Sequence, residues 1–234
     1  MKTLALETST LLASVTVIVD GRVVAEESSM RQNSHSEIIS TYSDSCLKKA
    51  GLQLGEIDVF AVGQGPGSFT GVRVAANAGK TFAYSFNKPL VTVDSLTLLA
   101  QAARTSSWPV LALINAYKNM VYTGLFDVSG EEPKFLLGPL AIPVRELSQH
   151  IQTEVLVVGD GYETYQQYFP PELSAKIHRD SQFSEFPHAK TLGLMAEKRA
   201  QVHNTLDWKS FVPLYIRASE AEETKKGILI SPLK

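Results

Sequence analysis

The chain has 234 residues, of which 44% are hydrophobic and 20% are charged, with a formal net charge of −2. This length can bury a proper core in one large domain or two small lobes. The near-neutral charge provides no bulk attraction for nucleic acid, so such a partner would need a local patch or another protein. The single cysteine, Cys46, excludes an intrachain disulfide, and no stretch is long enough to span a bilayer. We therefore expect a cytoplasmic α/β protein.

The first thirty residues alternate in the manner of β-strands. Leu4 and Leu6 share one face of "KTLALETS", and "LLASVTVIVD" follows with β-branched residues. Asp20-Gly21 is typical of a hairpin turn, because both residues can adopt positive φ. "RVVAEESSM" then returns, so the sequence predicts three antiparallel strands at the start.

A helix is predicted next, capped by Ser34 or Ser36 and closed by Gly51. Its apolar side includes Ile39 and Cys46. A cysteine on such a stripe is a packing residue rather than a nucleophile.

Two strand–helix units complete the first half. "EIDVFAVGQGPG" predicts a buried strand followed by a helix that runs to about Phe86, and "KPLVTVDS" predicts a strand followed by the helix "LTLLAQAAR". The order βββαβαβα implies parallel strands joined by helical crossovers, with a hairpin on one edge of the sheet.

The pattern resumes after Trp108. "VLALI", the turn "NAYKN" and "MVYTGLFDVSG" predict a second antiparallel pair, and "EVLVVGDG" predicts a later buried strand. "TLGLMAEKRAQ" reads as a helix, "FVPLYIR" as an extended segment and "ETKKGILISPLK" as a loose tail. We place the N-terminal lobe at residues 1–105 and the C-terminal lobe at 106–234, with the option that the C-terminal segment packs back on the first lobe.

The glycine-rich stretch "VGQGPGSFTGVR" does not have a phosphate-binding spacing. Ser68 stands where a dinucleotide fingerprint needs its third glycine, and no Gly-Lys-Ser/Thr completes a P-loop. The N–H groups from Ser68 to Gly71 can still receive an anion, as at any helix start. We expect this loop to fix the turn before a helix, with Ser68 or Thr70 as the cap.

The helix after this loop carries small residues at every fourth position: Gly71, Ala75, Gly79 and Ala83. Such a stripe forms a shallow groove that lets another element approach closely. Two interpretations stay open, namely a partner's helix or this protein's own sheet and first helix.

Side chains with catalytic potential are scarce. His35 has no histidine one turn later, because that position is Ile39, so no metal pair is formed. Ser68 lacks the context of a nucleophile and a His–Asp pair. Glu7 and Asp94 follow strands and are the acids best placed to face a cleft. The residues therefore predict no catalytic site and no metal site.

Five blocks in order resemble the TsaB (YeaZ) family: "LALETST", "HSEII", "GQGPGSFTGVRVA", "PLVTVDSL" and "PLYIR". The resemblance is near-continuous over residues 1–122 and looser to residue 213. Its most specific element is "GPGSFTGVR", residues 65–73.

The resemblance implies a two-lobed actin/Hsp70/sugar-kinase-like (ribonuclease H-like) fold, with mixed sheets and an antiparallel hairpin edge. It also implies a non-catalytic scaffold subunit for tRNA N6-threonylcarbamoyladenosine synthesis, which binds a TsaD-like transferase. A TsaE-type ATPase joins this assembly, tRNA is reached only through the complex, and the chain forms a homodimer when alone. The partner interface implied by the family consists of His35, Ile39, Ser43, Gly71, Ala75, Ala78, Gly79, Phe82 and Ala83.

The chain departs from the family pattern at two places. Glu7 ends the first strand where Asp is usual, and Asn115-Ala116-Tyr117 stands where Asp-Ala-Arg/Lys is usual. These changes leave a vestigial ligand cleft made of Glu7, Gly65, Gly67, Ser68, Asp94 and Asn115. The chain is expected to have no cofactor of its own, with ATP or ADP confined to the interface with a partner. The alternatives are a nucleotide-dependent phosphotransferase or ATPase of the same fold and, because it is an older label for relatives, a metallopeptidase.

Overall fold

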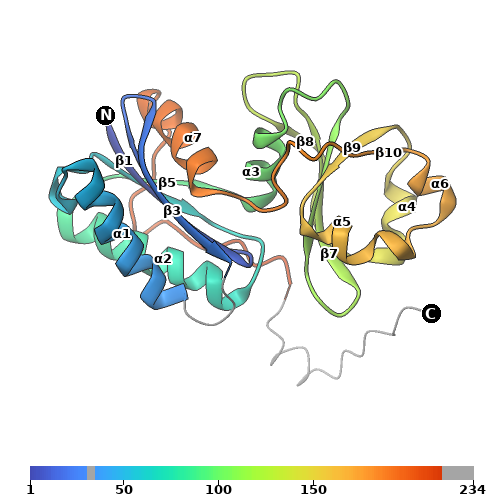
Figure 1. The fold of residues 1–234 in the computed structure, drawn as a ribbon, viewed down its shortest axis with the longest axis horizontal. Helices are drawn as coiled ribbons and strands as arrows, with labels where there is room; N and C mark the ends of the chain where they lie inside the picture. Colours follow the sequence, from blue (N-terminus) through green and yellow to red (C-terminus); the bar gives the residue numbers. More distant parts are fainter. Residues whose placement is uncertain (31–34, 218–234) are drawn as a thin grey trace. The chain divides into compact units, whose positions relative to one another are not determined.

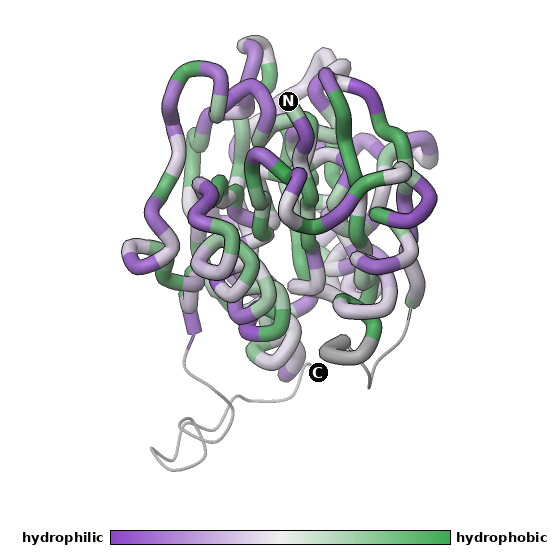
Figure 2. The backbone as a smooth tube through the Cα atoms, turned by 90° about the vertical axis from the view of Figure 1, so that its left-hand side faces the viewer, coloured by the Kyte–Doolittle hydropathy of each residue, from purple (hydrophilic) through white to green (hydrophobic). Residues whose placement is uncertain are grey.

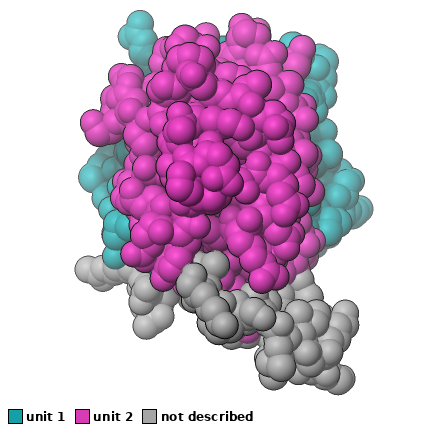
Figure 3. Space-filling model, turned by 90° about the vertical axis from the view of Figure 1, so that its right-hand side faces the viewer, with its two compact units in different colours: residues 1–98, 187–214 teal, residues 99–186, 215–234 magenta. Residues whose placement is uncertain are grey.

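The computed structural model describes residues 1–30 and 35–217, except for the side chains of residues 35–37 (Figure 1). The predicted cap Ser34 and the predicted tail "ETKKGILISPLK" lie outside the described residues. The chain divides into two compact units, coloured separately in Figure 3. Unit 1 contains residues 1–98 and 187–214, and unit 2 contains residues 99–186 and the segment from Tyr215.

Unit 1 is built on a five-stranded sheet with the order β3-β2-β1-β4-β5. Its strands are β1 (Lys2–Glu7), β2 (Leu12–Val19), β3 (Arg22–Met30), β4 (Val59–Gly63) and β5 (Leu90–Val93). The first three pair antiparallel, whereas β1, β4 and β5 run parallel. Asp20 and Gly21 both have positive φ in the first hairpin. The predicted mixed sheet with a hairpin edge is therefore confirmed.

Helices cover both faces of this sheet (Figure 1). They are α1 (His35–Ala50), α2 (Phe69–Phe86) and α7 (Ala189–Gln201), with a short 3₁₀ turn η1 (Leu54–Glu56) after α1. Because side chains alternate along a strand, Leu4 and Leu6 pack with α1 and α2, whereas Ala5 between them packs with α7. Hydrophobic residues recur along strands and helices, as the green segments in Figure 2 show.

The start of α1 differs from the prediction, whereas the environment of Cys46 agrees with it. The helix begins at His35, so the proposed cap Ser36 lies inside it. Cys46 is fully buried, and burial raises the pKa of its thiol to about 12. The predicted packing role of this cysteine is confirmed.

Unit 2 repeats the strand order of unit 1, reading β8-β7-β6-β9-β10 from its antiparallel edge. Its strands are β6 (Val110–Asn115), β7 (Met120–Asp127), β8 (Lys134–Pro143), β9 (Val155–Val158) and β10 (Ile177–His178). The strands β8, β7 and β6 pair antiparallel, and β6, β9 and β10 run parallel. Its helical pieces are short: η2 (Val144–Glu146), α4 (Leu147–His150), α5 (Asp160–Tyr165), η3 (Gln166–Tyr168) and α6 (Pro171–Ser174). The helix α3 (Ser95–Ala102) crosses the division between the units.

The sequence analysis missed β8, which turns the expected pair β6–β7 into a three-stranded meander. Gly138-Pro139 interrupts its apolar run, and a proline inside a strand is tolerated chiefly on a sheet edge. β8 is that edge strand. The predicted extended segment "FVPLYIR" contains no regular strand, although the Leu214 N–H donates to the Gln64 carbonyl at 2.8 Å.

The structure decides between the two interpretations of the small-residue stripe on α2. Gly71, Ala75, Gly79 and Ala83 are all buried. A Cβ atom on Gly79 would lie 2.2 Å from Cγ2 of Val62 in β4. The stripe thus brings α2 close to the protein's own sheet, and it is not an exposed groove for another helix.

Replacement of Gly79 by alanine is expected to destabilise the protein. Alanine favours a helix interior by about 1 kcal/mol over glycine, but here its Cβ would overlap Val62. Overpacking of this kind costs about 1–3 kcal/mol, so the Gly79→Ala variant should unfold at lower urea concentration. Asn77→Ala, at an exposed position of the same helix, is the matched control and should not lower stability. Equal stability of Gly79→Ala and wild type would contradict the packing described here.

Candidate docking site and cleft

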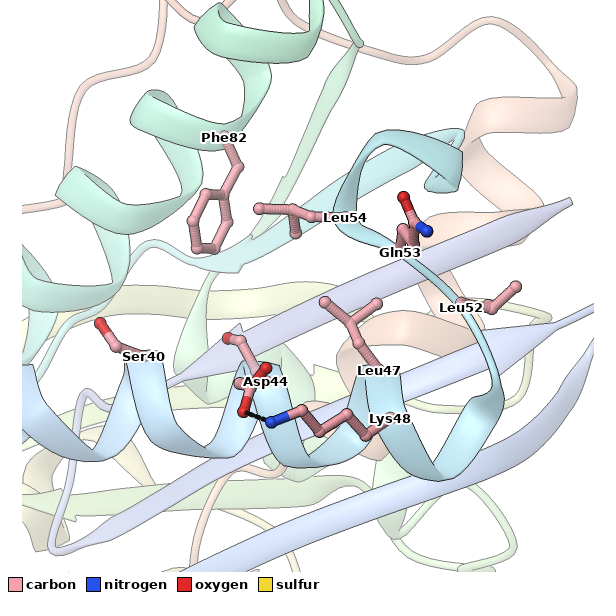
Figure 4. Close-up of a pocket in the computed structure, with 9 residues that line it drawn as sticks. Ser40, Asp44, Leu47, Lys48, Leu52, Gln53, Leu54 and Phe82 are labelled. Carbon is pink, nitrogen blue, oxygen red and sulfur yellow. Dashed lines mark hydrogen bonds and ion pairs between the residues drawn. The ribbon is translucent and has the colours of Figure 1, made fainter.

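The outer side of α1 and α2 carries a pocket that also involves the segment after α1. The pocket has a volume of about 420 Å³. Figure 4 shows Phe82 pointing from α2 toward α1, with Leu47 from α1 and Leu54 from η1 directed into the same space. Its lining residues are Ser40, Ser43, Asp44, Leu47, Lys48, Leu52, Gln53, Leu54 and Phe82.

The polar residues of this pocket differ in their partners. Lys48 Nζ lies 2.6 Å from Asp44 Oδ2, so these two charges, one helical turn apart and both largely exposed, pair with one another. Ser43 is only 4% exposed, and its Oγ has no hydrogen-bond partner among the described residues. The pocket therefore combines apolar walls with a rim on which the two charges neutralise each other, and the buried Ser43 hydroxyl is not accessible from it.

The interface residues implied by the family resemblance occupy different environments. Ser43 and Phe82 line the pocket, and Ala78 is partly buried against the hydrophobic core of unit 1. Ile39 is 1% exposed and belongs to the core, and the four residues of the small-residue stripe are buried within unit 1. These five positions cannot offer side chains to a partner in this conformation. The side chain of His35 is not among those that the structure describes.

The glycine-rich loop packs directly on the turn that follows β1. The Ser68 N–H donates to the Ser9 carbonyl at 2.6 Å. A Cβ atom on Gly67 would lie 2.0 Å from that carbonyl oxygen, and one on Gly71 would lie 2.0 Å from the carbonyl oxygen of Thr8. The glycines are therefore needed for contact between backbones. No open cradle for a phosphate is formed by these contacts.

Ser68 caps α2, as predicted. Its Oγ accepts the Gly71 N–H at 3.3 Å. Two of the N–H groups that could have bound an anion, those of Ser68 and Gly71, are thus occupied by protein acceptors.

Glu7 lies beneath the same loop and is fully buried. Its Oε1 accepts the Ser9 N–H at 2.6 Å, and its Oε2 lies 3.5 Å from the Ser95 hydroxyl. Burial raises the pKa of the Glu7 carboxyl. A Cβ atom on Gly63 would lie 1.9 Å from Oε2, so the carboxyl also fills the space beside β4. Glu7 thus links β1, β4 and α3 rather than facing a solvent-filled cleft.

Asp94 has a structural role at the start of α3. Its Oδ1 accepts the Thr97 N–H at 2.8 Å, which is the geometry of a helix cap. Burial raises the pKa of this carboxyl as well. This hydrogen bond explains why an aspartate stands at the end of β5, and no ligand is needed to explain it.

Asn115 belongs to a cluster in unit 2 that the sequence analysis missed. Its N–H donates to Asp160 Oδ1 at 3.0 Å, and its Oδ1 accepts from the Tyr117 N–H and the Tyr165 hydroxyl. Asp160 opens α5 after β9, and burial raises the pKa of its carboxyl to about 6. The sequence "LVVGDG" could have indicated Asp160, because it places an acidic residue at the end of a buried strand. Residues 117–119 all have positive φ, so the turn beside Asn115 is tightly constrained.

The described parts of the chain contain neither a metal-binding cluster of side chains nor a membrane-spanning helix. Within residues 1–30 and 35–217, no three His, Cys, Asp or Glu side chains are grouped so that they could hold a metal ion. Among the helices described, none is long and apolar enough to cross a membrane.

The fold places the chain in a broad structural class. Two units share one strand order, with an antiparallel meander followed by parallel strands. YeaZ from Pseudomonas aeruginosa superposes with a TM-score of 0.80 at 26% identity, over 92% of this chain and 99% of that one. The chain thus has the two-lobed actin-like (ribonuclease H-like) fold, as predicted.

Sequence comparison narrows this class to a family. The family model for TsaD, tRNA N6-adenosine threonylcarbamoyltransferase, matches residues 23–225. The tRNA threonylcarbamoyladenosine biosynthesis protein TsaB of Haemophilus influenzae is 28% identical over 225 residues, which cover 92% of each chain. The tRNA N6-adenosine threonylcarbamoyltransferase of Streptococcus uberis is 29% identical over 183 residues, 70% of this chain but 51% of that protein. The chain belongs to this family and, within it, to the TsaB (YeaZ) group.

The raised pKa of Asp160 predicts a pH-dependent stability. The folded protein holds this proton more tightly than the unfolded chain, so stability falls as pH rises from about 3.8 to about 6. An Asp160→Asn variant has no such proton. Its melting temperature relative to wild type should rise across this pH window and then level off, by roughly 2–4 °C for each kcal/mol.

The control is Asp127→Asn. Hydrogen bonds from Ser129 lower the pKa of Asp127 below its usual 3.8, so the difference between this variant and wild type should change only below about pH 3.8 and should stay constant across the window in which Asp160→Asn changes. A difference for Asp160→Asn that stays constant between about pH 4 and 7 would contradict the burial of its charge.

Proposed function

We propose that this chain is a non-catalytic scaffold subunit in tRNA N6-threonylcarbamoyladenosine synthesis, which binds and supports a TsaD-like transferase. The pocketed outer side of α1 and α2 is the observation that carries this proposal. Long helices laid side by side offer a docking surface for another pair of helices. The relatives are a tRNA threonylcarbamoyladenosine biosynthesis protein and a tRNA N6-adenosine threonylcarbamoyltransferase, so this tRNA modification is the reaction in which such a surface would be used.

The sequence similarity between this chain and the transferases supports the proposed binding of the two proteins to each other. One family model covers both, so the transferase is expected to carry a corresponding helix pair. Two related surfaces can then meet about a pseudo-two-fold axis, in the way that identical surfaces meet in a symmetric dimer. The same geometry lets two copies of this chain associate when the transferase is absent. A TsaE-type ATPase and tRNA belong to the proposal as components reached through the assembled complex.

The packing of the glycine-rich loop favours the scaffold role over an independent phosphotransferase. Within unit 1 the loop lies on the Thr8–Ser9 turn, and the Glu7 carboxyl is buried beneath it. A nucleotide would have to displace these contacts before it reached the loop. Any ATP or ADP is therefore assigned to an interface with a partner.

A bulky residue on the pocket rim should block the transferase. Ser40 is exposed on α1 beside the pocket, so Ser40→Trp should leave the fold intact and weaken binding at least about tenfold, or about 1.4 kcal/mol. Gln201→Trp, at an exposed position of α7 on the opposite face of the sheet, should bind normally. Calorimetry with the purified transferase measures both. Normal affinity of Ser40→Trp, or no binding by the wild type, would overturn the proposal.

Titration of the isolated chain with Mg-ATP tests the alternative. The scaffold role predicts no stoichiometric binding, because the loop and Glu7 make their contacts within the protein. Tight binding with one nucleotide per chain would favour the phosphotransferase instead.

A further inference from the structure

The carboxyl group of Glu7 is buried in unit 1 without a cation beside it among the described residues. Glu7 is 0% exposed, and the residues that contact its carboxyl, Ser9, Gly63 and Ser95, carry no charge. An ionised carboxylate in such a place is much less favourable than a neutral carboxylic acid, because the charge loses its water and no opposite charge replaces it. The surroundings of Glu7 therefore favour its protonated form.

The elements packed around Glu7 supply no ionisable side chain that pairs with it. The strands β2, β4 and β5, the helix α3 and the loop of residues 64–72 contain none. Asp94, just before α3, is another acid, and Arg73, the first ionisable residue of α2, is exposed and lies over the Phe69 ring. Burial raises the pKa of Glu7, and the main opposing contributions come from hydrogen bonds rather than from charges.

The helix α7 covers the face of β1 to which Glu7 belongs, because side chains alternate along a strand. Arg199 donates to a backbone carbonyl of β5, Glu197 accepts from the hairpin between β2 and β3, and the His188 ring lies 3.2 Å from a carboxylate of β3. The two lysines of this helix are exposed to solvent: Lys190 and Lys198. The ionisable groups of α7 are thus engaged elsewhere or in water.

The hydrogen bonds of Glu7 are too few to stabilise a charge. Its Oε1 accepts the Ser9 N–H at 2.6 Å, whereas its Oε2 is 3.5 Å from the Ser95 hydroxyl, which donates to Ser9 Oγ at 2.8 Å. Carboxylates that stay ionised when buried accept about two or three strong bonds, and a hydroxyl bound to a carboxylate lies about 2.5–2.7 Å away. Oε2 therefore lacks the close donors that a negative charge requires.

Glu7 is also joined to the contacts that hold the glycine-rich loop in place. The Ser9 carbonyl accepts the Ser68 N–H at 2.6 Å, and Ser95 donates its own N–H to the Gly65 carbonyl at 2.8 Å. Ser9 and Ser95 are 1% and 0% exposed, so water reaches the carboxyl only if these bonds loosen. An ionised Glu7 would draw water into this space, because water is the solvent that a charge needs.

We propose that Glu7 is a neutral carboxylic acid at neutral pH, and that loss of its proton opens the contact between the glycine-rich loop, the turn after β1 and the start of α3. The protonated form keeps the loop closed, and the ionised form, at higher pH, releases it. Glu7 is thus a positioning residue and touches no substrate. The inference stands apart from the proposed function, because it concerns unit 1 of the isolated chain.

The first test compares Glu7→Gln with the wild type. Burial raises the pKa of Glu7 above its usual 4.5, so the stability that its proton provides is lost as pH rises from 4.5 through the value in the folded protein. Glutamine is neutral at every pH, and its amide can accept from Ser9 and donate to Ser95. The folding constant of the variant relative to wild type should rise about tenfold per pH unit, or about a hundredfold between about pH 5 and 7. Urea unfolding across this range measures it.

Glu56→Gln is the matched control. Hydrogen bonds from Gln53 and Lys2 lower the pKa of Glu56, so the difference between this variant and wild type should stay constant from about pH 5 to 7. A relative folding constant of Glu7→Gln that also stayed constant over this range would overturn the proposal.

The second test observes the proton in the wild-type chain and does not depend on the folding of any variant. Carbon NMR of glutamate carboxyl groups is recorded against pH, with the Glu7 signal assigned through bonds from its backbone. The Glu7 signal should keep the position of a protonated carboxyl at about pH 7, whereas the Glu56 signal should ionise below the usual value for glutamate. A Glu7 signal in the ionised position at about pH 7 would overturn the proposal.

Amide hydrogen exchange tests the opening of the loop. Exchange is expressed relative to an unstructured peptide at the same pH, so that only the opening is measured. As the Glu7 signal ionises, the Ser68 and Ser95 amides should lose protection in the wild type and keep it in Glu7→Gln, with the paired amides of β2 as the internal control. Unchanged protection of Ser68 and Ser95 through the ionisation of Glu7 would show that the proton does not control the loop.

Discussion

The contact between the glycine-rich loop and the turn after β1 determines where α2 lies in unit 1. The Cα atoms of Gly67 and Gly71 lie so close to the carbonyl oxygens of Ser9 and Thr8 that no side chain fits between them. This contact fixes where α2 begins, and Gly79 then holds the helix against β4. With its start and one face fixed, α2 lies beside α1 and the pocket forms between them. A sequence that looks suited to phosphate thus serves to position a helix.

The two units have separate sheets of the same strand order, but they differ in the helices that cover those sheets. In unit 1, α1 and α2 have 16 and 18 residues, whereas α4, α5 and α6 of unit 2 have 4, 6 and 4. Helix-on-helix docking needs several turns of continuous helix, because its ridges and grooves are built from residues three and four apart. The longer helices are therefore the reason that the proposed docking site is assigned to unit 1. The other face of the unit 1 sheet is covered by α7, which comes from late in the chain.

Much of this fold could be predicted from alternation, turn residues and glycine positions, including the sheet of unit 1, the strands β6, β7 and β9 of unit 2 and the cap Ser68, whereas the two-residue strand β10 is too short to leave a pattern. β8 could not, because Gly138-Pro139 breaks the apolar run that would have marked it. The small-residue stripe of α2 has the same spacing whether it meets a helix or a sheet, so only the clash at Gly79 distinguishes them. The pocket combines α1, the 52–54 segment and Phe82, which no local pattern brings together. Asp160 lay in a recognisable motif, and its pKa depends on burial in the folded unit.

The central claim is that a TsaD-like transferase docks on the outer side of α1 and α2. Hydrogen exchange measured by mass spectrometry, on the chain alone and with an equimolar transferase, tests it most directly. The account predicts added protection in the second half of α1, in residues 52–54 and around Phe82 in α2, with α7 unchanged. Protection confined to unit 2 or to α7, or no change on mixing, would contradict it.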